Sequence, residues 1–219
     1  MLKYPCLVLD HDDTVVRSEA TVNYPCFLLA LETFRPGETM GYQEFVDWCF
    51  HYEFTDFLRI KYNFTEDELL REYHMWLEYS KTHIPPAYEG IGDVILEQKR
   101  RGGLVCVASL SSKANILRDY RTHFGIEPDL ICSCDDPKDQ RKPGAYPLQK
   151  IMQTYGLSPV ELLMVDDLKV GYEMASAAGV PMAFAGWSRR DFPAVRAQMS
   201  ALCDYSFDST EELKKFLFD

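Results

Sequence analysis

The sequence predicts an α/β fold, in which a doubly wound, Rossmann-like parallel sheet forms the core and an α-helical domain is inserted into it. Three observations support this prediction. Short, continuously apolar runs alternate with helical stretches from residue 87 onward, a pattern typical of parallel strands covered on both faces. A further apolar run lies near the N-terminus. Between these two parts, residues 17–86 have a helical pattern and are rich in aromatic side chains.

The length of 219 residues is sufficient for one such core with an insertion. We therefore expect a core domain formed by residues 1–16 and 87–219, and an inserted domain formed by residues 17–86. The sequence contains no internal repeat and no low-complexity segment that would favour another arrangement.

The elements can be placed in order along the chain. The first strand is expected in the run "CLVLD" near the N-terminus. In the inserted domain, Thr65 and Glu68 have the spacing of a helix capping box, and apolar residues follow at helical intervals. Later strands are expected at 103–109, 129–136, 161–167 and 180–186. Helices are expected at 91–101, 112–123, 145–155 and 171–178.

The composition argues against two classes of partner. The formal net charge is −11 and the pI is about 4.9, and no basic run is long enough to hold a nucleic-acid backbone or an anionic membrane surface. The pairs Arg100–Arg101 and Arg189–Arg190 are expected to be solvated helix ends. No apolar segment reaches the roughly 18 residues of a membrane span, and the N-terminus lacks the pattern of a signal peptide.

The seven cysteines are scattered and odd in number, which favours free thiols over a disulfide framework. Cys6 and Cys106 lie in apolar runs and are expected to pack in the core. Cys132 and Cys134 do not have the spacing of a zinc site. We therefore expect a reduced, cytoplasmic protein.

Polar residues gather at or after the expected strands, where a parallel sheet binds its ligands. These residues are Asp10, Asp12, Asp13, Ser109, Lys142, Asp166 and Asp167. Each also has a purely local explanation. Aspartates can end a strand in a turn, a serine can cap the next helix, a lysine can be solvated, and acidic residues favour a helix N-terminus.

Four segments resemble, in order, the motifs of the haloacid dehalogenase-like hydrolases that carry a helical cap after the first strand. "LVLDHDDTVVRSE" resembles the family's Asp-x-Asp-x-Thr strand end, and "VCVASLSS" its Ser or Thr after an apolar strand. "QRKPGAYPLQKIM" resembles its Lys-Pro before a helix, and "ELLMVDDLKVGYEMASAAGV" its acidic residues before Gly and an Ala-rich helix. The likeness covers essentially the whole chain outside the inserted domain and points to the helical-cap phosphatase type, which includes phosphoglycolate phosphatases and β-phosphoglucomutase-like proteins.

This resemblance implies a phosphatase that uses covalent catalysis. Asp10 would be the nucleophile that forms an aspartyl-phosphate. Asp12 would protonate the leaving oxygen and then take a proton from the attacking water. Ser109 and Lys142 would bind the transferring phosphoryl group, and the inserted domain would act as a cap over the site.

The resemblance also implies a Mg²⁺ site built from hard oxygen ligands. The implied ligands are Asp10, the main-chain carbonyl of Asp12, Asp166 and Asp167. Of the last pair, Asp167 has the better spacing to Gly171 and is expected to be a direct ligand, whereas Asp166 is expected to bind directly or through water.

Four neighbouring positions are expected to matter for structure or for substrate fit. Asp13 stands where the family usually has glycine, and aspartate tolerates left-handed or turn conformations better than most residues. His11 is expected to be structural or to line the rim of the site. Leu110 replaces a small or polar residue and Val165 replaces a glycine, and both can change how closely a substrate approaches the backbone.

Two alternatives remain open at this point: a phosphosugar mutase of the same family, and a non-catalytic protein that binds a phosphate ligand. A haloacid dehalogenase is disfavoured because that class lacks the second aspartate. A phosphonatase is disfavoured because Lys61 and Lys81 have no identifiable context for a Schiff base. The expected partner is a small phosphorylated metabolite, with no nucleic acid and no membrane, bound by a monomer or a homodimer.

Overall fold

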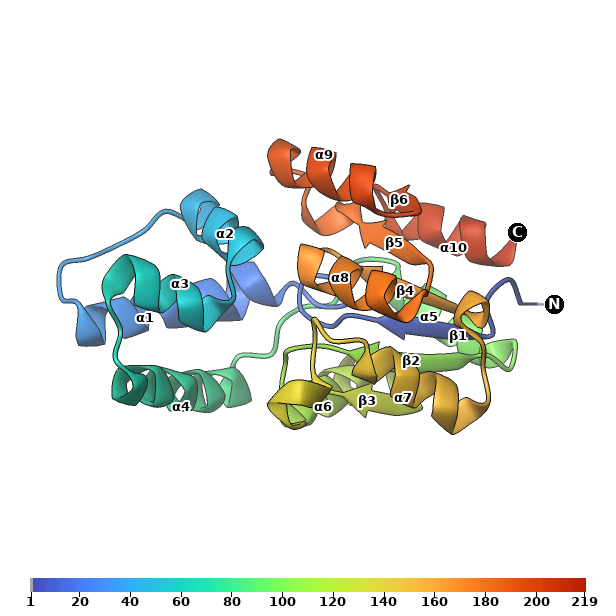
Figure 1. Cartoon of the computed structure of the whole chain (residues 1–219), viewed down its shortest axis with the longest axis horizontal. Helices are drawn as coiled ribbons and strands as arrows, with labels where there is room; N and C mark the ends of the chain where they lie inside the picture. The colour runs from blue at the N-terminus through green and yellow to red at the C-terminus, as the bar shows by residue number, and fades with distance from the viewer. Residues whose placement is uncertain (1) are drawn as a thin grey trace. The chain divides into compact units, whose positions relative to one another are not determined.

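The computed structural model describes residues 2–219 and contains, over that range, a six-stranded sheet in the order β3-β2-β1-β4-β5-β6 (Figure 1). Every neighbouring pair of strands is parallel. The strands are β1 (Cys6–Leu9), β2 (Leu104–Ala108), β3 (Leu130–Cys132), β4 (Leu162–Asp166), β5 (Met182–Ala185) and β6 (Tyr205–Phe207). This order, which reverses at β1, is that of a doubly wound Rossmann-like sheet and confirms the predicted fold class.

All five predicted strands are present, and the differences lie at the edges of the sheet. Residues 129–136 were expected to be extended, but β3 covers only Leu130–Cys132, because the polar segment after it turns through Ser133 and Asp136. The edge strand β6 was not predicted. It has only three residues, and one of its side chains is exposed, so it lacks the continuous apolar run that marked the other strands.

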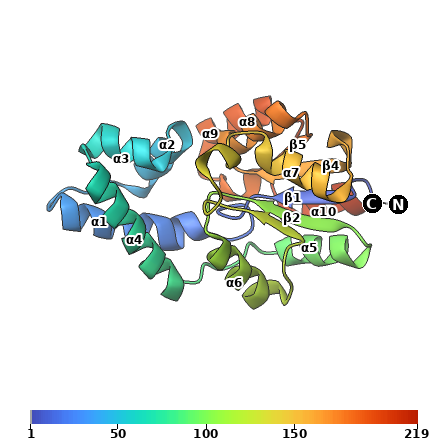
Figure 2. The same ribbon diagram turned by 60° about the horizontal axis from the view of Figure 1, so that its bottom comes forward.

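Helices cover both faces of the sheet (Figure 2). Those of the core are α5 (Ile91–Arg100), α6 (Lys113–Phe124), α7 (Tyr146–Tyr155), α8 (Lys169–Ala178), α9 (Pro193–Leu202) and α10 (Thr210–Phe218). Helix α5 contacts α6 and α10, and α7 contacts α8. The four predicted helices correspond to α5–α8, whereas α9 and α10 were not assigned from the sequence.

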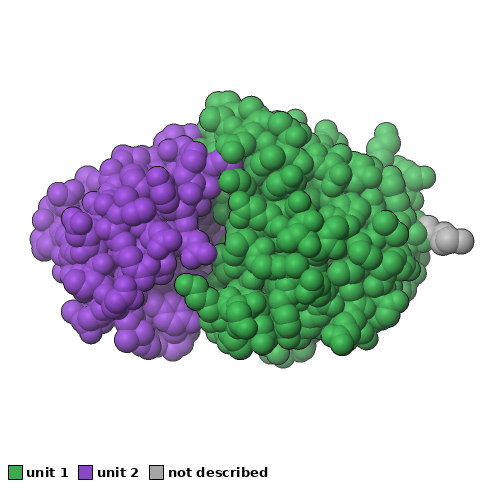
Figure 3. Space-filling model, viewed as in Figure 1, with its two compact units in different colours: residues 1–17, 86–219 green, residues 18–85 purple. Residues whose placement is uncertain are grey.

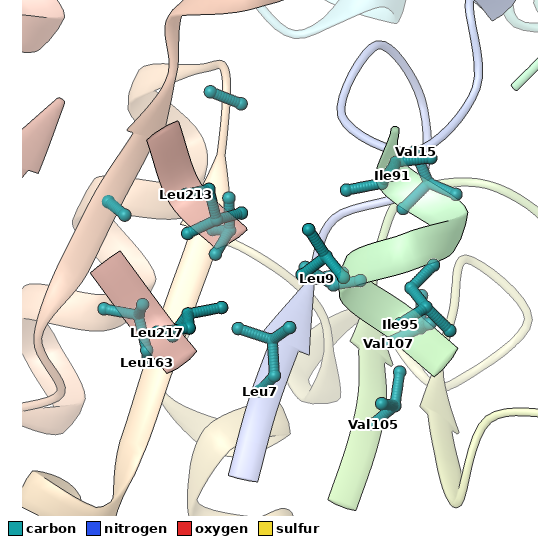
Figure 4. Close-up of a cluster of buried hydrophobic side chains, with 14 of the residues drawn as sticks. Leu7, Leu9, Val15, Ile91, Ile95, Val105, Val107, Leu163, Leu213 and Leu217 are labelled. Carbon is teal, nitrogen blue, oxygen red and sulfur yellow. The ribbon is translucent and has the colours of Figure 1, made fainter. Parts of the chain in front are cut away.

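The main apolar cluster lies between the sheet and the helices α5 and α10 (Figure 4). Leu7 and Leu9 point from the central strand β1 into this cluster, and both are fully buried. Because side chains alternate along a strand, Cys6 and Val8 point to the opposite face, where they are also fully buried. Strand β1 is therefore apolar on both sides, which explains its unbroken apolar sequence.

The chain divides into two compact units, with the second unit spanning Ser18–Pro85 (Figure 3). This inserted unit is helical. It contains the short π-helix η1 (Glu19–Asn23) and the helices α1 (Tyr24–Phe34), α2 (Tyr42–His51), α3 (Phe54–Tyr62) and α4 (Glu66–Thr82). The rest of the chain, on either side of this insertion, forms the sheet and the helices that cover it.

Aromatic packing and a helix cap stabilise the inserted unit. The rings of Phe27, Phe45 and Phe57 pack against one another, with the Phe27 and Phe45 centroids 4.9 Å apart. The predicted capping box is confirmed, because the Thr65 side chain accepts from the Glu68 N–H and the Glu68 carboxylate accepts from the Thr65 N–H. Such caps contribute about 1 kcal/mol.

Glu72 is a buried carboxyl group in α4, and burial raises its pKa from 4.5 to about 7. As pH rises from about 4.5 to about 7, the unfolded chain releases this proton before the folded protein does, so the folded state loses stability. We expect Glu72→Gln to stabilise the protein by about 3 kcal/mol at pH 8 and to have little effect at pH 4.

Urea unfolding at both pH values measures this difference. Glu78→Gln is the matched control, because Glu78 lies on the same helix with its side chain 73% exposed. An equal effect of the two substitutions at pH 8 would contradict a burial cost at Glu72.

The cysteines are free thiols. Cys6 and Cys106 are fully buried on adjacent strands, as expected for small core residues. Every helix within residues 2–219 is too short or too polar to span a membrane.

Candidate active site

Two of the predicted aspartates meet where the order of the strands reverses. Strands β1 and β4 are neighbours, with Leu9 in register with Val165. The pairing continues one residue further, because the Asp10 N–H donates to the Val165 carbonyl at 2.9 Å. Asp10 and Asp166 therefore leave the carboxyl ends of adjacent strands, the place where open parallel sheets bind ligands.

Lys142 lies between these two carboxylates. Its Nζ is 2.7 Å from Oδ1 of Asp10 and 2.5 Å from Oδ2 of Asp166, and its side chain is 2% exposed. It precedes α7 and is joined to Pro143 by a cis peptide bond. Burial lowers the pKa of Lys142, but the charges and hydrogen bonds of Asp10 and Asp166 outweigh this and raise it. The reading of Lys142 as a solvated surface lysine is therefore wrong.

A third carboxylate completes a cluster. Asp10, Asp166 and Asp167 are all buried and offer carboxylate oxygens within 4.8 Å of one another. Burial raises the pKa of Asp10; Lys142 opposes this shift, and the charges of Asp166, Asp167 and Asp12 add to it. Three hard oxygen donors at this spacing fit a hard divalent cation such as Mg²⁺. A bound cation would also reduce the repulsion among the carboxylates, which adds to the effect of burial on the Asp10 pKa.

Gly171 makes room for Asp166. A Cβ atom at position 171 would lie 2.1 Å from Oδ2 of Asp166, so any other residue there would collide with the carboxylate that Lys142 binds. The other oxygen of Asp166 accepts the N–H of Leu168 at 2.9 Å. The absence of a side chain at Gly171 therefore leaves space for the Asp166 carboxylate, whereas the sequence spacing had related this glycine to Asp167.

The loop after β1 contains a residue in the left-handed conformation, as expected. Asp13 has a φ of 53°, in the left-handed region, which confirms the expected left-handed or turn conformation at this position. Its Oδ1 accepts the hydroxyl of Tyr88 at 2.9 Å. Asp12 is partly exposed, and its side chain is outside the three-carboxylate cluster found in the described residues.

Ser109 directly follows β2, the other neighbour of β1. It is buried, its N–H donates to the Cys132 carbonyl, and its Oγ accepts the N–H of Ser111 at 3.2 Å. The N-cap of α6 is Ser112, so the alternative reading of Ser109 as the helix cap is wrong. Leu110, next along the chain, is 44% exposed.

Of the two roles expected for His11, structural or at the rim of the site, its contacts support the structural one. It is 1% exposed, and its Nε2 lies 3.0 Å from Oδ2 of Asp119. Asp119 also accepts from Arg118. The partner on α6 could not be found from sequence, because the pair is separated by 108 residues and Asp119 lies in no motif.

Arg189 corrects a prediction. It was expected to be solvated with Arg190, but its side chain is 2% exposed and its Nε donates to Oδ2 of Asp167 at 2.8 Å. A terminal nitrogen of the same guanidinium also contacts this oxygen. The expectation for Arg100 and Arg101 is confirmed, because both are exposed at the end of α5. One feature of the sequence indicated that a further buried cation was needed. Several aspartates were expected to cluster with a single lysine, which leaves a deficit of positive charge.

Comparison with known proteins gives a consistent result. The family model described as "Haloacid dehalogenase-like hydrolase" matches residues 7–185. Pyrophosphatase PpaX of Bacillus cereus strain AH820 is 23% identical over 222 residues, covering 100% of this chain and 98% of that protein. Pyrophosphatase PpaX of Halalkalibacterium halodurans is also 23% identical, covering 87% of each chain.

Solved structures show the same fold. CbbY from Rhodobacter sphaeroides, solved with xylulose-1,5-bisphosphate, has a TM-score of 0.75 at 18% identity and covers 97% of this chain and 96% of that one. A predicted phosphoglycolate phosphatase from Haemophilus somnus has a TM-score of 0.77 at 16% identity, with 99% of each chain covered.

Proposed function

Because this chain belongs to the haloacid dehalogenase-like hydrolase family, we propose that it hydrolyses a small phosphate monoester through an aspartyl-phosphate intermediate, with Mg²⁺ as cofactor. One observation carries the proposal. A buried lysine joins Asp10 to Asp166, and the Asp167 carboxylate lies within 4.8 Å of both. This arrangement would combine a nucleophile, a cation for the phosphoryl group and a set of metal ligands at the carboxyl ends of two adjacent strands.

In the proposed reaction, a carboxylate oxygen of Asp10 attacks phosphorus and the bond to the leaving oxygen breaks. Asp12 donates a proton to that oxygen. Water then attacks the aspartyl-phosphate, Asp12 takes a proton from it, and inorganic phosphate and free Asp10 are released. Ser109 and Lys142 would hold the phosphoryl oxygens, where positioning and charge neutralisation supply most of the acceleration.

The proposed Mg²⁺ ligands are Asp10, the main-chain carbonyl of Asp12, Asp166 and Asp167. When bound, the ion would neutralise charge on the phosphoryl oxygens during transfer. The carboxylate spacing supports this ligand set, and the choice of Mg²⁺ rests on its preference for a few hard oxygens together with substrate phosphate.

The proposed substrate class is a small phosphorylated metabolite, and residues 17–86 are proposed to form the cap domain of the family. The names of the similar proteins include a pyrophosphatase, a phosphoglycolate phosphatase and a bisphosphate-binding protein. All three names involve phosphate, which supports the class but not one metabolite. The free cysteines support the proposed placement in the reducing cytoplasm.

Removal of the metal tests the proposal. We expect the protein to hydrolyse an aryl phosphate in Mg²⁺ and to lose at least about 99% of that rate in EDTA, since the carboxylates would then repel the phosphoryl group. Added Mg²⁺ should restore the rate. A phosphosugar mutase would instead hydrolyse simple esters slowly and need a bisphosphate activator, and a non-catalytic binding protein would bind phosphate without turnover.

A further inference from the structure

Arg189 is buried beside Asp167, and the proposed reaction gives this arginine no role. Asp167 follows β4, and Arg189 follows the neighbouring strand β5 through a short 3₁₀ turn at Gly186–Ser188. Their side chains are 1% and 2% exposed. The guanidinium also lies 5.9 Å from the ring centroid of Phe192. Arg189 is thus fixed inside the protein, beside one of the three clustered carboxylates.

The segment around Arg189 is tied to the loop after β1. The Trp187 indole N–H donates to the Thr14 carbonyl at 3.1 Å. The Thr14 hydroxyl lies 3.4 Å from Oδ1 of Asp167, a weak contact, while Arg189 binds Oδ2. One oxygen of the Asp167 carboxylate is therefore contacted by a neutral hydroxyl group, and the other by a positively charged guanidinium group.

Charge in the cluster is nearly balanced before any metal binds. Asp10, Asp166 and Asp167 contribute three carboxyl groups, and Lys142 and Arg189 contribute two buried cations. Lys142 is needed for the proposed reaction, because it contacts the nucleophile. Arg189 contacts a proposed metal ligand, so its charge opposes that of an incoming divalent cation.

We propose that Arg189 is a resident counter-cation of the metal site, which neutralises Asp167 in the metal-free protein and lowers the affinity of the site for Mg²⁺. The inference rests on the proposed function, because it requires Asp167 to bind the metal. Arg189 acts through Asp167 and is a positioning residue. A metal-free site stabilised in this way stays folded and releases its ion readily.

Substitution of Arg189 separates its charge from its hydrogen bonds. Arg189→Gln removes the charge but keeps an N–H donor for Asp167, whereas Arg189→Lys keeps the charge. We expect Arg189→Gln to bind Mg²⁺ about tenfold more tightly or better, because repulsion between like charges at this range is large inside a protein. Arg189→Lys should bind Mg²⁺ as the wild type does.

Isothermal titration calorimetry with Mg²⁺ on the metal-free full-length protein gives the affinity without reference to activity. Arg121→Gln is the matched control, because Arg121 pairs with Glu127 with its side chain 59% exposed. It makes the same change in net charge outside the cluster and should leave the Mg²⁺ affinity unchanged. Urea unfolding should show Arg189→Gln destabilised in EDTA, with Mg²⁺ recovering more stability than it adds to the wild type.

Equal or weaker Mg²⁺ binding by Arg189→Gln would overturn the inference while leaving the proposed function intact. If neither protein bound Mg²⁺, both the inference and the proposed metal dependence would fail. Should Arg189→Gln unfold in EDTA, recovery of the folded protein in Mg²⁺ supports the inference. A variant that stays unfolded in Mg²⁺, beside a folded Arg189→Lys, contradicts it.

Discussion

Asp10→Asn is expected to reduce kcat for an aryl phosphate by about ten-thousand-fold or more, because an amide cannot form the aspartyl-phosphate. The substitution keeps the size and shape of the side chain. Because burial already raises the pKa of Asp10, replacing it with a neutral isostere should cost little stability. Steady-state kinetics in Mg²⁺ and thermal unfolding of the same preparations test both statements.

Two further variants make the result specific. Asp93→Asn is the same substitution at an aspartate that pairs with Lys214 on the surface, with its side chain 65% exposed, and it should be fully active. Asp12→Asn should still react with substrate but hydrolyse the intermediate slowly, so that mass spectrometry finds a phosphoryl group on the peptide containing Asp10. Activity of Asp10→Asn within tenfold of the wild type would show that another group is the nucleophile.

The sheet was largely predictable because its strands are apolar on both faces. Such strands are read directly from the sequence as unbroken apolar runs. The elements that were not predicted, α9, β6 and α10, all follow β5 in the chain, and β6 has only three residues. There the chain is stabilised by contacts distant in sequence, such as Leu213 and Leu217 against the central strands, which periodicity does not reveal.

Within the site, residues that belong to motifs were easier to predict than residues that only complete the charge balance. The left-handed φ of Asp13 followed from the comparison with a glycine position. No local feature of the sequence predicted the contact between Arg189 and Asp167, because that contact depends on β5 lying beside β4. His11 could be assigned to a structural role, but its partner Asp119 depends on how α6 packs. Partners set by packing require the structure.

Lys142→Met is expected to lower the free energy of unfolding in EDTA by about 3–5 kcal/mol, because it leaves Asp10 and Asp166 buried without their cation. The raised pKa of Lys142 keeps its stabilising charge present at all pH values below its unfolded value of 10.5, and the contribution is lost only as pH rises through the higher folded value. The destabilisation should therefore be nearly constant between pH 7 and pH 9, each urea curve being compared with wild type.

Lys150→Met is the matched control for this loss. Lys150 lies on α7, 3.9 Å from Asp136, with its side chain 36% exposed, and the loss of a pair of this kind costs about 1 kcal/mol or less. A loss of the same size in both variants would show that the buried pairs of Lys142 contribute no more stability than the partly exposed pair of Lys150.

The double variant Lys142→Met/Asp166→Asn separates stability from catalysis. Removing one buried carboxylate along with the lysine reduces the uncompensated charge, so the double variant should be more stable than Lys142→Met alone. It should remain inactive, because in the proposed mechanism the phosphoryl group still lacks its cation and the metal has lost a ligand. Recovered stability with recovered activity would mean that Lys142 serves the fold alone. Recovered stability without recovered activity would mean that the inactivity of Lys142→Met does not come from its lower stability.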